Sequence, residues 1–423
     1  MVILGALIVL GTIWLLVKRY ESRMVLFASG VLMAVLSGQP FAAFDAFAAS
    51  MVNGGLIQAI CSVMGFAFVM KMTGCDQHLI HLLANGLKKV RPILIPGATL
   101  ATFAINIALP SAAGTAAAVG AVFIPILISA GIHPAVAGAA VWAGTFGSML
   151  NPGLSHNPFI AKISGANVMT VISVHAAADI TAGIIAAICI AAVAFFLKEH
   201  KGYVGAEPAA TAATVASSAP VKPNIIFAIV PIIPIALLVV VATDTVPFLK
   251  KMGIPAAMLI GALIGLAVTR KGPTDVTKAF FEGMGSAYGH IMGIIIAAGT
   301  FVGGMTAIGL VKEFIDLLTH STGVAKYAAT FGPWALAIIS GSGDAAAFAF
   351  NEAVSPHAKQ FGLEVINMGS IAALAGAIGR TMSPINGAGI ICAMIAGVNP
   401  MELAKRNALG MTLAVIAAML ILL

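Results

Sequence analysis

The sequence predicts an all-α polytopic membrane protein with two inverted-topology repeats of about five spans, each repeat carrying a re-entrant hairpin and a broken helix. Three observations support this fold. The 423 residues are 60% hydrophobic and 9% charged, whereas soluble domains carry roughly 25% charged residues. Apolar runs of about 20 residues recur along the chain, as in transmembrane helices. The third observation is an internal duplication.

Five residues of the first half recur in the second half at one common offset of 232 positions. The recurring residues are Gly147, Pro152, Gly165, Asn167 and Met169, which return as Gly379, Pro384, Gly397, Asn399 and Met401. A duplicated apolar chain is typical of secondary transporters, whose binding site lies between the two repeats. We therefore expect the functional residues to come from both halves.

The first repeat is predicted to cover residues 1–198. Its hairpin (92–130) has apolar arms joined by a Pro-, Ser- and Gly-containing tip, and Gly and Pro interrupt its broken helix (134–164). The predicted elements are spans at 2–18, 24–38 and 54–74, an amphipathic piece at 42–52, hairpin arms at 92–109 and 116–130, the broken helix, and a span at 176–197.

A polar, small-residue stretch at 199–223 is predicted to be a flexible cytoplasmic connector. The second repeat, at 224–423, follows the same order. Its predicted elements are spans at 226–243, 255–269 and 285–309, a hairpin at 327–355 with arms 327–340 and 345–355, a broken helix at 366–396 and a span at 404–423.

Each pair of arms forms either two full spans or one re-entrant hairpin, and both alternatives add an even number of crossings. Each half then crosses the membrane an odd number of times, so the second half is inverted. With the N-terminus outside, fourteen of the 22 Lys and Arg residues fall in cytoplasmic loops and five in outer loops. This bias predicts that both termini are periplasmic.

Few charged residues lie deep in the apolar segments, where each costs roughly 2.5–3.5 kcal/mol on insertion scales. Asp344 lies at the tip of the second hairpin, Glu352 on its second arm, and Arg380 in the second helix break. Arg380 offers a planar bidentate donor for a carboxylate, or it pairs internally with one of the two acids. Asp344 is either a cation or proton site or a helix cap. For Glu352, packing or pairing is favoured.

The predicted site combines the hairpin tips and the helix breaks of both halves. The substrate-binding candidates are Ser111, Thr115, Asn151, Ser340, Ser342, Arg380, Thr381, Ser383 and Asn386. The cation- or proton-coupling candidates are Asp344, Gly114, Gly343, Asn157 and Glu352. Na⁺ or H⁺ is the expected coupling ion, and no other metal or cofactor is expected. Because no nucleotide-binding, metalloprotease or serine-hydrolase motif occurs, we do not expect an enzyme.

Three segments of the second half resemble the DcuC-type anaerobic dicarboxylate carriers. Gly341-Ser-Gly-Asp344, with Phe350 and Glu352, resembles that family's Gly-Ser-Gly-Asn…Phe-x-Glu hairpin. Ile378-Gly-Arg-Thr-Met-Ser-Pro384 resembles its Leu-Gly-Arg-Thr-Leu-Ser-Pro break, and Pro400-Met-Glu-Leu-Ala-Lys-Arg406 resembles its Pro-Phe-Glu-Val-Val-Lys-Arg. The likeness extends over most of the chain.

The resemblance implies the fold of the ion-transporter superfamily and a homodimer with a scaffold and a moving transport domain. It implies four-carbon dicarboxylate substrates, such as succinate and fumarate. No nucleic-acid partner is expected, because the basic residues cluster in short loops, as membrane topology explains. Two departures stand out. Asp344 replaces an Asn, and Leu150-Asn-Pro-Gly-Leu-Ser-His156 differs from the family's Ala-Pro-Thr-Ser-Gly-Asp. One interpretation is that a carboxylate has moved from the first break to the second tip.

We therefore expect a secondary carrier for C4-dicarboxylates in the bacterial inner membrane, working by elevator-like alternating access. Asp344 also keeps an alternative open, a monovalent-cation/proton antiporter on the same architecture. A third class, an intramembrane enzyme using Asp344 and Glu352, ranks far below both.

Overall fold

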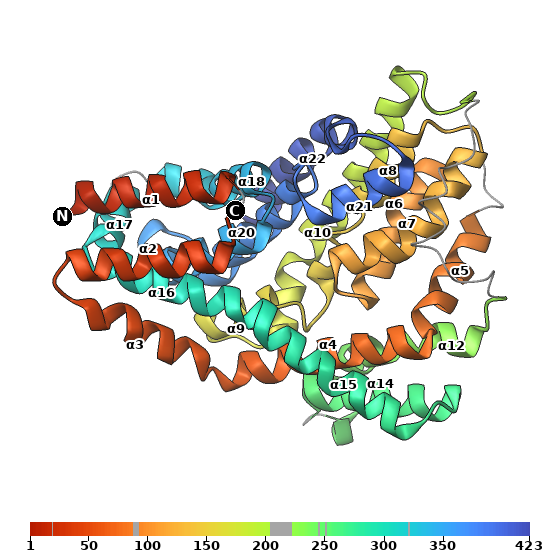
Figure 1. Cartoon of the computed structure of the whole chain (residues 1–423), viewed down its shortest axis with the longest axis horizontal. Coiled ribbons are helices and arrows are strands. Elements are labelled where there is room, and N and C mark those ends of the chain that lie inside the picture. The colour runs from red at the N-terminus through yellow and green to blue at the C-terminus, as the bar shows by residue number, and fades with distance from the viewer. Residues whose placement is uncertain (19, 88–92, 204–221, 244–245, 250–251, 320–321) are drawn as a thin grey trace.

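The computed structural model describes residues 1–18, 20–87, 93–203, 222–243, 246–249, 252–319 and 322–423 (Figure 1). Every regular element in these ranges is a helix, and they contain no β-strand. Six helical segments of the described chain are long and apolar enough to cross a membrane. They are 54–73, 112–129, 168–196, 225–242, 273–307 and 400–422. The chain is a multi-pass, all-helical membrane protein.

Helices of the first half follow the predicted order, apart from an additional helix at 75–87 that was not predicted, and otherwise differ from it mainly at their ends. They are α1 (Val2–Val17), α2 (Ser22–Leu36), α3 (Pro40–Met51), α4 (Gly54–Thr73), α5 (Cys75–Leu87), α6 (Leu94–Ala108), α7 (Ala112–Ser129), α8 (Pro134–Ala143), η2 (Gly147–Leu150), α9 (His156–Ser164) and α10 (Val168–Phe196). The largest difference is the start of α10, eight residues before the predicted position.

The second half contains helices in the same order, with more 3₁₀- and π-helical segments among them. They are α12 (Ile225–Ile229), η3 (Val230–Ile232), α13 (Ile233–Ala242), η4 (Pro247–Leu249), α14 (Ile254–Thr269), α15 (Pro273–Ala287), η5 (Tyr288–Met292), α16 (Gly293–Ala307), α17 (Leu310–Thr319), α18 (Thr322–Ser340), α19 (Gly343–Ala353), η6 (Ser355–Phe361), α20 (Val365–Arg380), α21 (Gly387–Ala396) and α22 (Pro400–Leu422). Most of the predicted connector lies outside the described residues.

The recurring residues make equivalent turns in the two halves. Gly165 and Gly397 end α9 and α21 in the left-handed region, with φ of 70° and 68°, where glycine carries no steric penalty. Two residues later, the side chain of Asn167 accepts a hydrogen bond from the Met169 amide, and Asn399 does the same at the Met401 amide. These caps start the last helix of each half.

Glycines also let each broken helix press against the first arm of its hairpin. A Cβ on Gly147 would lie 2.2 Å from the Phe103 carbonyl oxygen in α6, and a Cβ on Gly379 would lie 2.4 Å from the Trp334 carbonyl oxygen in α18. Neither position has room for a side chain. The two breaks are therefore held directly against the two hairpins.

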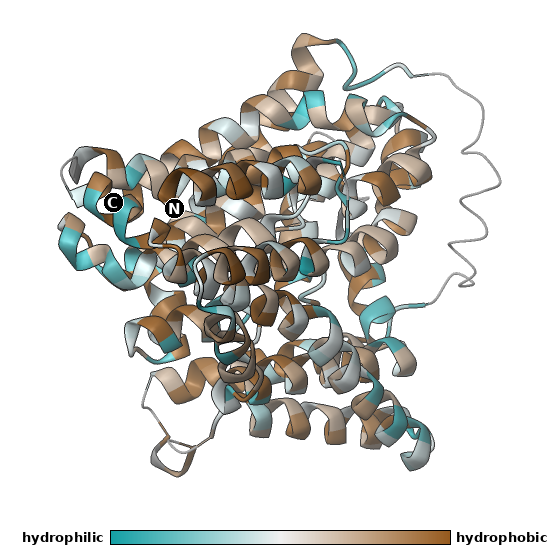
Figure 2. Ribbon diagram, turned by 60° about the vertical axis from the view of Figure 1, so that its left-hand side comes forward, coloured by the Kyte–Doolittle hydropathy of each residue, from teal (hydrophilic) through white to brown (hydrophobic). Residues whose placement is uncertain are grey.

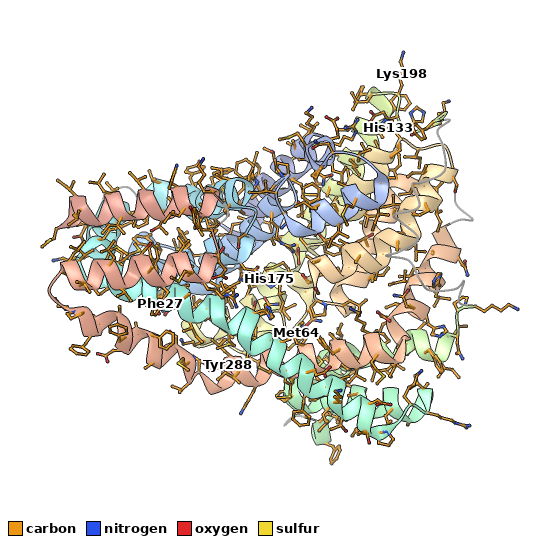
Figure 3. The ribbon with its side chains drawn as sticks, viewed as in Figure 1. Phe27, Met64, His133, His175, Lys198 and Tyr288 are labelled. Carbon is orange, nitrogen blue, oxygen red and sulfur yellow. The ribbon has the colours of Figure 1, made fainter. Side chains whose placement is uncertain are left out.

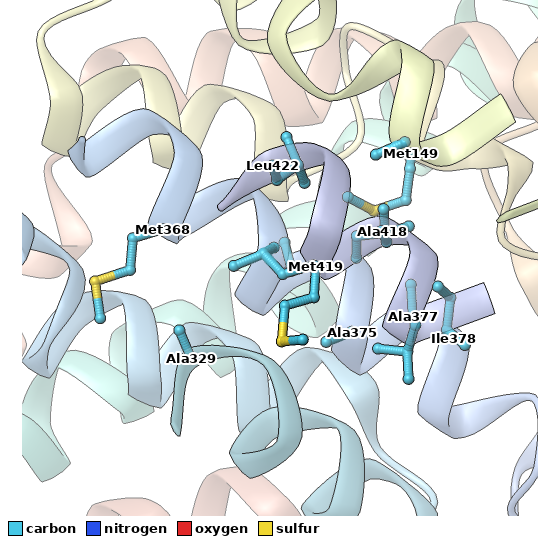
Figure 4. Close-up of a cluster of buried hydrophobic side chains, with 14 of the residues drawn as sticks. Met149, Ala329, Met368, Ala375, Ala377, Ile378, Ala418, Met419 and Leu422 are labelled. Carbon is cyan, nitrogen blue, oxygen red and sulfur yellow. The ribbon is translucent and has the colours of Figure 1, made fainter. Parts of the chain in front are cut away.

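The helices form two groups with α10 and α22 between them (Figure 1). On one side α16 packs against α2 and α3, and on the other α21 packs against α7 and α8. The long final helices α10 and α22 pack against each other. A core of small and flexible side chains from α18, α20 and α22 fills the space beside them, and it includes Ala329, Met368, Ala375 and Met419 (Figure 4).

Hydrophobic residues predominate along the helices, while hydrophilic residues gather at helix ends and connections (Figure 2). Large apolar side chains such as Leu7, Trp14, Phe196 and Phe248 are exposed. A surface of this kind is expected to face lipid rather than water.

Candidate binding site between the two halves

The first helix break is an irregular segment between α8 and α9, braced by two asparagines. The side-chain amide of Asn151 donates to the Ile107 carbonyl at the end of α6 (2.7 Å), and its oxygen accepts from the Gly153 amide. The Asn157 amide donates to the carbonyls of Met149 (2.7 Å) and Asn151 (2.9 Å). Both side chains are buried. Their hydrogen bonds pair backbone groups that would pair with one another in a regular helix.

The first hairpin tip joins α6 to α7 and is held closed by its own side chains. Ser111 caps α7 by accepting a hydrogen bond from the Gly114 amide (3.1 Å). The buried hydroxyl of Thr115 donates to the Leu109 carbonyl and accepts from the side chain of Asn106. Asn106 also accepts from the Ser148 amide (2.7 Å), which ties the tip to the first break.

The second tip and the second break are tied together in a similar way. Ser342 caps α19, and the Ser340 hydroxyl donates to the Leu336 carbonyl. Asn386 caps α21 and donates to the Gly341 carbonyl at the tip (2.9 Å). The Thr381 hydroxyl donates to the Ile378 carbonyl, while the buried Ser383 hydroxyl has no partner among the described residues.

Two contacts connect the halves at this point. His156, the first residue of α9, lies 3.0 Å from a carboxylate oxygen of Asp344, and its ring stacks on Phe348. The Asp344 side chain is 52% exposed, whereas that of His156 is 3% exposed. Arg380, at the end of α20, donates to the Thr145 carbonyl of the first break (2.9 Å). The first break therefore touches both the tip and the break of the second half.

Arg380 and Asp344 are neighbours without a direct ion pair. Their charges interact, and the stem of Arg380 packs against Gly343, where an added Cβ would lie 3.2 Å from the Arg380 Cδ. Within the described chain, however, the Asp344 carboxylate contacts His156. Asp344 is not the N-cap of α19, because the side chain of Ser342 accepts the capping hydrogen bond.

Glu352 lies apart from this group. It sits near the far end of the short α19, and its charge interacts with Lys162 of α9 rather than with Arg380. Packing or pairing therefore stays the prediction for Glu352. Gly114 is exposed at the first tip, and Gly343 is buried at the second.

Sequence reasoning missed two buried polar residues on α10. His175 and Asp179 are both fully buried, and His175 lies 3.0 Å from the side-chain oxygen of Asn157. Figure 3 shows His175 near the middle of the molecule. Because the span was predicted to start at residue 176, His175 fell outside it. The structure places His175 and Asp179 on one helix, one turn apart.

This multi-pass protein gathers buried polar groups from both halves at its broken helices. Such an arrangement is typical of membrane transporters. Comparison with known sequences specifies this class further. The profile of the DcuC family, described as C4-dicarboxylate anaerobic carrier, matches residues 7–423. The chain belongs to this family, and it is a transporter rather than an enzyme.

The relatives include proteins with and without an assigned substrate. A putative uncharacterized transporter of Haemophilus influenzae is 43% identical over 63% of this chain and 98% of its own length. A probable anaerobic C4-dicarboxylate transporter DcuC of Vibrio cholerae is 25% identical over 99% of this chain and 96% of its own. The anaerobic C4-dicarboxylate transporter DcuC of Escherichia coli K12 is 22% identical over 98% and 95%.

Proposed function

We propose that the chain is a secondary active transporter for C4-dicarboxylates of the succinate, fumarate and malate type in the bacterial inner membrane. Arg380 is the observation that carries this proposal. Its guanidinium has five N–H donors, and one is engaged by a described residue, at the Thr145 carbonyl. The remaining donors suit a carboxylate. The names of the V. cholerae and E. coli relatives support the same substrate class.

A dicarboxylate needs a second anchoring point. Four helices, α7, α9, α19 and α21, begin at the tips and breaks, and helix N-termini favour anions. Ser383 adds a buried hydroxyl with no partner among the described residues. Since the hydroxyls of Thr115 and Thr381 already donate to backbone carbonyls, we assign these two residues a positioning role.

Among the tips and breaks, we assign the cation-coupling role to the second half. At the first break, the Asn157 amide already occupies the Met149 and Asn151 carbonyls that could otherwise ligate Na⁺. Asp344 instead offers a half-exposed carboxylate beside Arg380 and His156. An anionic substrate that binds Arg380 would weaken the attraction between Arg380 and Asp344, so substrate binding and Asp344 charge would be linked.

We further propose two inverted repeats, a homodimer and elevator-like movement. Arg406 near the start of α22 contacts Glu199 just beyond the end of α10 (2.7 Å), so the last helices of the two halves run in opposite directions. The 11 residues of α19 span only about 16 Å, which is short of the ~30 Å hydrocarbon core. This supports a re-entrant second hairpin.

The proposal is tested by counterflow of labelled succinate in proteoliposomes against a panel of unlabelled acids, with and without Na⁺. We expect four-carbon dicarboxylates to drive counterflow and monocarboxylates to fail. The alternative antiporter gains no support from the family assignment. Na⁺-dependent proton flux without any organic anion, combined with no succinate counterflow, would overturn the proposal and favour the antiporter.

A further inference from the structure

Asp179 is the most isolated acid in the described part of the chain. It lies in the middle of α10, is 0% exposed, and has no hydrogen-bond partner for either carboxylate oxygen. Its helix face is lined by the buried residues Ala178, Ala182 and Gly183. An ionised carboxylate without partners in such surroundings is very costly. The group is therefore held in its neutral, protonated form.

His175 is the neighbouring titratable residue on α10, and no hydrogen bond joins its side chain to that of Asp179 in this conformation. It precedes Asp179 by one helical turn, a spacing that places the two side chains on the same face. Asn157 donates to two carbonyls through its amide nitrogen, so its oxygen must be the acceptor toward His175. The His175 Nε2 consequently carries a hydrogen. Its Nδ1 then bears a free lone pair, and this buried atom has no partner among the described residues.

The elements packed against α10 supply no counter-charge for Asp179 among the described residues. α6, α8, η2 and α13 contain no titratable side chain. The charged or titratable groups of α9, α20 and α22 are His156, Lys162, Arg380, Glu402, Lys405 and Arg406. Of these, His156 contacts Asp344, Arg380 contacts Thr145, and Arg406 contacts Glu199 and Glu402.

The pair is nevertheless connected to the binding site. His175 holds Asn157, which braces the first break, and the adjacent residue His156 reaches the half-exposed Asp344. A change of charge on His175 or Asp179 would alter the His175–Asn157 hydrogen bond and so the position of the break. Conversely, movement of the break would change the surroundings of the pair.

From this geometry we infer that Asp179 and His175 form a proton-binding site that couples transport to the proton gradient. This inference rests on the proposed function, because it names H⁺ as the coupling ion of that carrier. The site takes up one proton in the conformation in which it is dry and unpaired. It releases the proton when movement of the first break admits water to α10.

The test compares two activities in proteoliposomes. Asp179→Asn keeps the size of the side chain but removes the titratable proton. We expect the ratio of pH-gradient-driven succinate uptake to succinate counterflow to fall at least about tenfold. Succinate-linked proton flux, followed with an internal pH dye, should fall in parallel. His175→Gln, which keeps a donor for Asn157, should change the ratio in the same direction.

Two further variants separate coupling from folding. Asp179→Glu restores a proton-carrying group and should recover much of the ratio, which a purely structural role would not predict. Asp45→Asn removes an exposed carboxylate on α3 and should leave both activities unchanged. An Asp179→Asn protein with wild-type gradient-driven uptake and proton flux would overturn the inference.

Infrared spectroscopy tests the site independently of any substrate. The wild-type protein at neutral pH should show the carbonyl stretch of a protonated carboxyl group that disappears in Asp179→Asn. Absence of that band overturns the proton site even if succinate is transported. If the wild-type protein fails to transport any dicarboxylate while the band is present, the proposed function fails and the proton-binding site stands.

Discussion

At the residue scale, the two departures from the family pattern meet in space. His156 ends the divergent first break, and Asp344 replaces the expected Asn at the second tip. The structure places their side chains 3.0 Å apart. The interpretation that an acidic group has moved between the halves therefore concerns two segments that are in direct contact. The resemblance could indicate both positions, but the contact needed the folded chain because 188 residues separate them.

Asp76 makes a residue-scale prediction about pH. It lies in the first turn of α5, which is outside the candidate membrane spans, and burial raises its pKa to about 6. The unfolded chain ionises this group near its ordinary value of about 3.9. Stability therefore falls as pH rises from about 4 to 6, and the full penalty of up to about 3 kcal/mol is present above pH 6.

Asp76→Asn should remove that penalty. We expect a higher melting temperature in detergent at pH 7 than for the wild type, with the difference closing below about pH 4. Asp275→Asn, at an exposed position in the first turn of α15, is the control. A difference that persists unchanged at low pH would contradict this explanation.

At the scale of elements, the repeated residues are explained by turns and close contacts. Gly165 with Asn167, and Gly397 with Asn399, form the same helix end and helix start. The sequence identified these pairs and most helix positions, because glycine and asparagine have strong local preferences. It misplaced the start of α10, because it followed the apolar run and gave no weight to the cap at Asn167.

Buried polar partners are harder to predict from sequence than helices. His175 and Asp179 lie in an apolar run without any local motif, and their isolation depends on what α6, α20 and α22 place around them. The i, i+4 spacing was the available signal. The tip serines were correctly located, but their role as caps depends on backbone geometry.

The close contact at the second break predicts the effect of a single methyl group. In Gly379→Ala the new Cβ would lie 2.4 Å from the Trp334 carbonyl oxygen. We expect a loss of about 1–3 kcal/mol of stability and lower transport. Gly332→Ala on α18, where the Cβ meets nothing within 4 Å, should be neutral or slightly stabilising. Equal melting temperatures for the two variants would argue against the packing of the break on the hairpin.

At the scale of the whole molecule, the two halves contribute different kinds of residue to one site. The first half contributes mainly braced backbone, through Asn106, Asn151 and Asn157. The second half contributes the charges Asp344 and Arg380. The two halves repeat the order of their helices, but the charged residues at the tips and breaks come from the second half.

The proposed orientation predicts which surface residues are accessible from outside. Lys359 in η6 and Lys201 beyond α10 are both exposed, and the charge bias places them on opposite sides of the membrane. A membrane-impermeant maleimide should label Lys359→Cys in right-side-out vesicles and leave Lys201→Cys unlabelled until the membrane is permeabilised. The reverse pattern would show that the orientation is inverted.

The most direct test of the account is succinate counterflow by Arg380→Lys in proteoliposomes. Lysine keeps the charge but cannot form the planar two-donor contact with a carboxylate. Loss of one charge-assisted hydrogen bond corresponds to about 1.5–3 kcal/mol, so we expect counterflow at limiting succinate to fall at least about tenfold, with the melting temperature close to that of the wild type. Full succinate counterflow by a correctly folded Arg380→Lys protein would contradict the central claim that Arg380 binds the substrate carboxylate.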